Sequence, residues 1–177
     1  MKFNHDNISP LDSRYANKIS ELRENFSESA LIKIRFDIEI EWLLYICVNL
    51  PKTFKPLSKQ SIKKITKFKD SFDNKSVLKI KKIESTTNHD VKAVEYYIRD
   101  YFLKDKVLST YIHLIHFGLT SEDINSLSYA HMIKDGIYIY IKELDKVNKI
   151  LKNYSKKWAK QPFLARTHGQ AASPSTL

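Results

Sequence analysis

Residues 121–160 read SEDINSLSYAHMIKDGIYIYIKELDKVNKILKNYSKKWAK, and this stretch decides the fold. Its apolar side chains recur at alternating steps of three and four residues. This heptad seam consists of Ala130, Ile133, Ile137, Tyr140, Leu144, Val147, Leu151, Tyr154 and Trp158. The spacing is typical of a helix that packs in a bundle or coiled coil. Gly136 lies inside the seam and is expected to weaken or bend it, at a cost of about 1 kcal/mol relative to alanine.

A helix over residues 121–160 is expected to be about 60 Å long. A compact chain of 177 residues has a diameter of only about 40 Å. The seam is therefore expected to need partners, either from other subunits or from sequence beyond these residues.

The sequence before this stretch also shows helical periods, and no segment alternates as a strand would. Helices are expected over residues 16–26, 28–50, 59–72, 76–83, 91–103 and 108–117. Ser27, Ser58, Asp90 and Ser121 are the expected N-caps. The predicted fold class is all-α. A small helical N-terminal domain over residues 1–111 precedes residues 112–177, the start of a truncated central helical bundle.

The composition excludes several classes of protein. A hydrophobic content of 42% is sufficient for a core, which excludes a wholly disordered chain. The single cysteine, Cys47, cannot form an internal disulfide, so a reducing cytoplasm is the expected compartment. No apolar run approaches the ~20 residues of a membrane span. No metal site is expected, because no Cys, His and carboxylate spacing matches a ligand set.

The net charge of +10 comes almost entirely from one stretch. Residues 52–82 contain eleven lysines and only two acids, Asp70 and Asp73. Lysine without interleaved arginine or stacking aromatics is a weak signal for nucleic acid. We interpret the stretch as a solvated lysine face, with a polyanion site as the alternative.

Four polar clusters interrupt the helical patterns and supply the candidate chemistry. They cover residues 14–15, 86–90, 118–125 and 166–170. Thr120 and Ser121 precede a helix, where they serve as a cap or, together with free N–H groups, bind a carboxylate or phosphate. His89 and His168 lie in polar segments and are candidates for a general acid or base. The histidines in apolar-periodic segments are expected to be structural: His113, His116 and His131.

The motifs in these clusters have a recognisable order. They are SPLDSRY (residues 9–15), ESTTNHDVKAVEY (84–96), TSEDIN (120–125) and RTHGQ (166–170). In this order and spacing they resemble the bacterial type of the adenylosuccinate lyase family, within the fumarase/aspartase superfamily. TNHDVKAVEY is the most specific part. Ser13, Ser85 and Ala171 depart from the usual glycine, arginine and proline, and none removes a group expected to touch substrate.

The resemblance implies the all-α fold of that superfamily and a β-elimination. The family splits adenylosuccinate into AMP and fumarate, and releases fumarate from the succinylaminoimidazole carboxamide ribotide of purine synthesis. The implied partners are a small nucleotide substrate and further copies of the chain, in a homotetramer. No cofactor is implied.

The resemblance also assigns residues. The predicted catalytic residue is His168, as the general acid toward the leaving nitrogen. The predicted substrate-binding residues are Arg14, Tyr15, Asn88, His89, Asp90, Thr120 and Ser121. Thr120 and Ser121 match hydroxyls that hold the succinyl carboxylates, and Arg14 suits the phosphate of the nucleotide.

One family element has no match in these residues. The family's general base is a serine on a loop with a Met-Pro-x-Lys-x-Asn-Pro core, and the 177 residues contain no such segment. We expect the N-terminal portion of a lyase, either as a fragment or from a truncated gene, without activity alone. The alternatives are another lyase of the superfamily and a non-catalytic basic helical protein that binds nucleic acid.

Overall fold

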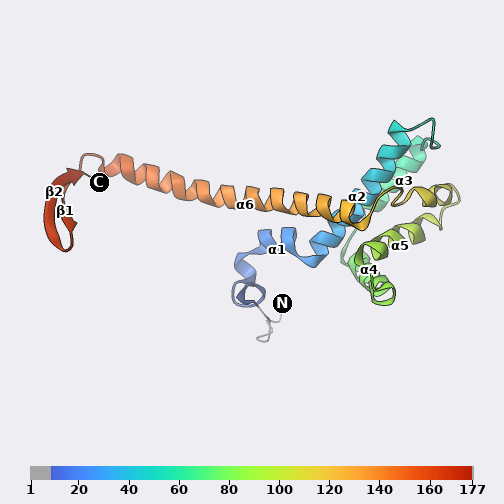
Figure 1. Cartoon of the computed structure of the whole chain (residues 1–177), viewed down its shortest axis with the longest axis horizontal. Helices are drawn as coiled ribbons and strands as arrows, with labels where there is room; N and C mark the ends of the chain where they lie inside the picture. Colours follow the sequence, from blue (N-terminus) through green and yellow to red (C-terminus); the bar gives the residue numbers. More distant parts are fainter. Residues whose placement is uncertain (1–8, 177) are drawn as a thin grey trace. The chain divides into compact units, whose positions relative to one another are not determined.

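A computed structural model describes residues 9–176 of the chain (Figure 1). These residues form two compact units, of which the first ends at Gly136 and the second begins at Ile137. The outer ends of the two expected domains, residues 1–8 and residue 177, lie outside the described residues. The domain boundary expected after Tyr111 concerns the arrangement of the whole family and stays a prediction.

The predicted all-α class is confirmed. The first unit contains η1 (Pro10–Asp12), η2 (Ala16–Lys18), α1 (Ser20–Phe26), α2 (Glu28–Asn49), α3 (Lys59–Asp70), α4 (Asn74–Thr87), α5 (Asp90–Phe102), η3 (Leu108–Leu114) and the start of α6 (Ser121–Trp158). Helix α6 continues into the second unit and is followed there by β1 (Pro162–Thr167) and β2 (Gln170–Thr176).

Two of the four expected N-caps are confirmed and two are wrong. The hydroxyls of Ser27 and Ser58 accept backbone N–H groups at the starts of α2 and α3. At α5 the cap is His89 rather than Asp90, because the Asp90 carboxylate is engaged with a neighbouring arginine. At α6 the cap is Thr120, one residue earlier than expected, and Ser121 is the first helical residue.

Helix α2 is the centre of the first unit. It packs against α1, α3, α4 and α5, and its apolar residues therefore occur all around it rather than on one face (Figure 1). Phe36 is fully buried, with its ring 5.1 Å from the ring of Phe68 in an edge-to-face arrangement. Phe72 and Tyr97 complete this aromatic cluster. Such rings contribute both buried area and specific geometry.

Cys47 lies near the end of α2 with 1% of its surface exposed. Burial raises the pKa of its thiol.

None of the helices in residues 9–176 is long and apolar enough to cross a membrane.

Gly136 has a packing role as well as a place in the heptad seam. Helix α6 continues through it, and a Cβ atom built there would lie 2.3 Å from Cζ of Phe26. Next to this contact, Asn25 Nδ2 donates to the carbonyl of Met132 at 2.8 Å. The glycine therefore provides the space in which α1 packs against α6.

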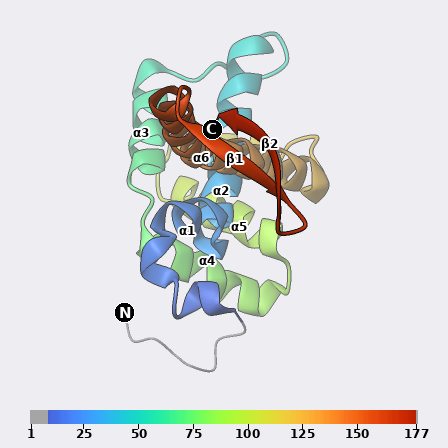
Figure 2. The same cartoon turned by 90° about the vertical axis from the view of Figure 1, so that its left-hand side faces the viewer.

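The C-terminal hairpin was not predicted from the sequence. Strands β1 and β2 pair antiparallel around His168 and Gly169, whose φ angles are +52° and +78° (Figure 2). Positive φ at both central residues characterises the tight hairpin turns that match strand twist. Nearly every side chain of the hairpin is exposed. Because neither face of the hairpin is buried, its sequence shows no alternation of apolar and polar residues.

The heptad seam beyond Gly136 is exposed in the described chain. Its side chains are between 44% and 67% exposed at Ile137, Tyr140, Leu144, Val147, Leu151 and Tyr154. Scattered single apolar side chains are ordinary on a surface, whereas this row is continuous along the helix.

Candidate functional site

Two predicted site residues from different motifs meet where α5 and α6 begin. His89 Nε2 lies 3.4 Å from the Ser121 hydroxyl oxygen, although the two residues are far apart in the chain. The other ring nitrogen, Nδ1, accepts the backbone N–H of Lys92 at 3.2 Å and so caps α5. A neutral ring with Nδ1 as acceptor carries its proton on Nε2. The N–H of His89 therefore points toward Ser121.

Asn88 and Asp90 flank this histidine. Asn88 ends α4 in the left-handed conformation, with φ +51°, and its N–H donates to the Glu84 carbonyl. Asparagine tolerates this conformation better than most residues. The Asp90 carboxylate accepts the Val91 N–H at 2.8 Å and pairs with Arg35 at 2.7 Å. Partial burial acts to raise its pKa, but the Val91 N–H and the Arg35 charge outweigh it and hold the pKa below the usual range.

Thr120 is engaged with a carboxylate of its own helix. Its backbone N–H and its hydroxyl both donate to Asp123 Oδ2, at 2.7 and 2.8 Å. The Thr120 N–H and hydroxyl lower the pKa of Asp123. Asp123 therefore occupies part of the position that a bound carboxylate would take at the start of α6. Ser121 keeps its hydroxyl directed toward His89 instead.

The three helices that carry this cluster share a small apolar core. Ile38 of α2, Val91 of α5 and Ile124 of α6 are buried against one another. Apolar burial of this kind brings the helix ends together without fixing their orientation.

Sequence reasoning missed the charged groups beneath the cluster. Arg35 is 4% exposed and contacts both Asp90 and Asn125. Glu39, one turn further along α2, is 1% exposed and contacts His116 Nδ1 at 2.5 Å. No sequence signal singles them out, because α2 also carries Glu28, Lys33, Asp37 and Glu41. Burial of both faces of α2 could not be deduced from the sequence alone.

The buried Glu39 pairs with the partly buried His116. The Glu39 hydrogen bond raises the pKa of His116, against the effect of burial. The second carboxylate oxygen, Oε2, is buried and has no hydrogen-bond partner within residues 9–176. The expectation that His116 is structural agrees with this arrangement.

Arg14 and Tyr15 lie in the turn between η1 and η2. Both are exposed, and the guanidinium carbon of Arg14 is 5.4 Å from the centre of the Tyr15 ring. Among the described residues, no hydrogen bond or ion pair joins them to the His89 cluster. Their predicted role in binding the nucleotide stays a prediction.

His168 belongs to the second unit. It is the first residue of the hairpin turn and its side chain is exposed. The turn presents the imidazole at the tip of the hairpin, so it is accessible to a group from outside the unit. Its predicted role as general acid stays a prediction.

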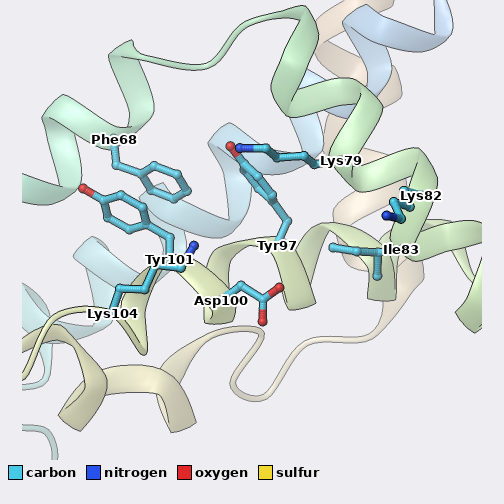
Figure 3. A pocket seen from close by; sticks show the side chains of 8 residues that line it. All are labelled: Phe68, Lys79, Lys82, Ile83, Tyr97, Asp100, Tyr101 and Lys104. Atoms are coloured by element: carbon cyan, nitrogen blue, oxygen red, sulfur yellow. The ribbon is translucent and has the colours of Figure 1, made fainter.

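A separate pocket of about 270 Å³ lies between α3, α4 and α5 (Figure 3). Its lining residues are Phe68, Lys79, Lys82, Ile83, Tyr97, Asp100, Tyr101 and Lys104. The rings of Phe68 and Tyr101 are stacked at 3.6 Å. The pocket borders the lysine-rich stretch and contains none of the predicted site residues. Within residues 9–176, no group of three or more His, Cys, Asp or Glu side chains is arranged to hold a metal ion.

Comparison with known proteins identifies the class. A sequence model of the lyase family matches residues 13–177, and the chain belongs to this family.

The individual relatives sharpen that result. An adenylosuccinate lyase of Buchnera aphidicola subsp. Schizaphis graminum is 39% identical over 173 residues. Adenylosuccinate lyases of Legionella pneumophila (strain Corby) and Escherichia coli (strain K12) are 40% and 39% identical. Each comparison covers 96% of this chain but only 38% of the relative. The resemblance to adenylosuccinate lyases is thus confirmed for a chain that spans about two fifths of their length.

Proposed function

We propose that the chain forms the N-terminal part of an adenylosuccinate lyase. The observation that carries this proposal is the match of 96% of the chain to relatives with that name, at 39–40% identity. The meeting of His89 and Ser121 supports it, because two separate family motifs converge at one place.

The proposed reaction is a β-elimination. A base removes a proton from the carbon next to a carboxylate of the succinyl group, and the electron pair forms the carbon–carbon double bond of fumarate. The carbon–nitrogen bond breaks, and an acid protonates the departing nitrogen of AMP. The same elimination is proposed for succinylaminoimidazole carboxamide ribotide. Such a site must be preorganised for the negative charge that develops around the carboxylate.

The residues take the following proposed roles. His168 is the general acid. Ser121 and Thr120 hold the succinyl carboxylates at the start of α6. To do so, Thr120 must release its hydrogen bonds to Asp123 and donate them to the substrate. His89, with Asn88 and Asp90, contacts the substrate. Arg14 and Tyr15 contact the nucleotide, with Arg14 at the phosphate.

The proposal includes the oligomeric state and the cellular compartment. The exposed seam of α6 fits a homotetramer whose active sites combine residues from several subunits. A purine-synthesis enzyme in the reducing cytoplasm agrees with the single, unpaired cysteine.

The test replaces the matching N-terminal segment of the Escherichia coli lyase by these 177 residues. Fumarate release from adenylosuccinate is followed by ultraviolet absorbance. The chimera is expected to be active and the chain alone inactive, because the family's serine loop has no match here. His168→Ala in the chimera is expected to lower kcat by about 100-fold or more.

Several outcomes would contradict the proposal. One is an assembled chimera that binds the nucleotide but releases no fumarate. Another is a chimera that prefers argininosuccinate, malate or aspartate, since this would favour a different lyase of the superfamily. Activity of the isolated chain would show that its base lies within these residues.

A further inference from the structure

One buried side chain touches both helix starts that carry the candidate site. Nη2 of Arg35 lies 2.7 Å from Asp90 Oδ2, and its Nε donates to Asn125 Oδ1 at 3.0 Å. Asp90 opens α5 next to His89, and Asn125 lies one helical turn after Ser121 on α6. Arg35 itself comes from α2.

Burial makes these contacts obligatory. A guanidinium removed from water is strongly destabilising unless it is paired and hydrogen-bonded. The side chain of Arg35 is 5% exposed, so it cannot exchange its two partners for solvent. The guanidinium is planar and its donors keep fixed angles to one another. Its two contacts therefore fix the position of Asp90 relative to Asn125.

The contact between His89 and Ser121 is too weak to fix the two helix starts by itself. The His89 side chain is 49% exposed, and the 3.4 Å separation from Ser121 is at the long end for a hydrogen bond. The apolar contacts of Ile38, Val91 and Ile124 draw the helices together but are non-directional. Within residues 9–176, the remaining directional connection between the two helix starts is the one made by Arg35.

We propose that Arg35 is a positioning residue: it clamps the start of α5 to the start of α6, so that His89 and Ser121 face one substrate. The catalytic consequence rests on the proposed lyase function, whereas the structural clamp does not. Displacement of a positioned group by about 1 Å can lower a rate by about 100-fold.

The first experiment measures the clamp in the 177-residue chain. Nuclear Overhauser effects between the ring protons of His89 and the β protons of Ser121 are recorded by NMR. They are expected in the unchanged chain and lost in Arg35→Met. Arg99→Met is the matched control, because Arg99 also pairs with a carboxylate on α5, that of Glu95, whereas among the described residues it has no contact with Asp90 or Asn125. This control is expected to keep the signals.

The second experiment measures kcat/KM in the chimera with the Escherichia coli lyase. Arg35→Met is expected to lower it about 100-fold, and Arg99→Met by less than threefold. Arg35→Lys separates positioning from charge. Lysine keeps the positive charge beside Asp90 but lacks the planar donors that reach Asn125 as well. It is expected to recover less than a tenth of the lost activity.

Each result decides the proposal. Persistence of the His89–Ser121 signals in Arg35→Met, or full recovery by lysine, would overturn it. Loss of the signals in Arg35→Met together with an inactive parent chimera would leave the clamp standing and reject the lyase function. If Arg35→Met does not fold, Asn125→Ala removes one of the two contacts without changing charge. It is then expected to weaken the signals and lower kcat/KM about tenfold, and no change in either would overturn the proposal.

Discussion

The two units of the chain differ in where their apolar side chains lie. In the first, Phe36 and the rings around it are enclosed by α2, α3 and α5. In the second, the seam residues from Ile137 to Tyr154 are about half exposed. Hydrophobic burial stabilises a fold only where the surface is removed from water. The first unit therefore contains its own source of stability, whereas the seam contributes little to the stability of the second.

The largest expected effect tests this contrast directly. Phe36→Ala is expected to lower the free energy of unfolding by about 4 kcal/mol, because it leaves a cavity in a closed core. Leu144→Ala, on the exposed seam, is expected to lower it by about 0.5 kcal/mol or less in the monomeric chain. Urea unfolding followed by circular dichroism measures both. Equal losses would show that the seam is covered in solution.

The boundary between the units gives an intermediate effect. Gly136→Ala is expected to destabilise the chain by about 1 kcal/mol, because the new methyl group overlaps the far edge of the exposed Phe26 ring and displaces it. Helix propensity alone predicts the opposite, a gain of about 1 kcal/mol. Thermal unfolding separates the two. The control adds Gly136→Ala to a Phe26→Ala background, in which the overlap is absent. The double variant is expected to be about as stable as Phe26→Ala alone.

The smallest expected effect concerns pH. The pKa of His116 is higher in the folded chain because the Glu39 carboxylate accepts a hydrogen bond from the protonated ring. Its contribution to stability is complete below about pH 6.5, the pKa of the unfolded chain, and is lost as pH rises through the higher folded pKa. Over that range one proton changes the slope by at most about 1.4 kcal/mol per pH unit.

The measurement compares unfolding free energies at several pH values between 6 and 8. His116→Gln is expected to flatten the decline with rising pH. His113→Gln, an exposed neighbour on η3, is the matched control and is expected to leave the decline unchanged. A decline that survives in His116→Gln would assign the effect to other groups.

Much of the fold was predictable because its signals are local. The heptad spacing identified α6, and the serines before α2 and α3 identified their starts. The caps of α5 and α6 were misplaced by one residue, because Asp90 and Ser121 have partners on other helices. The hairpin was not predicted because it contains two prolines and buries neither face.

The site was predictable only in part. The motifs selected His89 and Ser121, and the structure brings them together. Arg35 was missed, because its importance depends on contacts with residues far along the chain. Whether a charged residue of a helix is buried depends on which elements pack against each face of that helix. Long-range contacts of this kind leave no periodic trace in a sequence.

The burial of Cys47 has a practical consequence. It is the only cysteine in the sequence, and its thiol is enclosed in the core of the first unit. Because a buried thiol with a raised pKa reacts slowly, the unaltered chain presents no readily accessible thiol to a maleimide dye. A cysteine introduced at an exposed position of α6 becomes the single point of labelling, and its fluorescence reports whether a second chain lies over the seam.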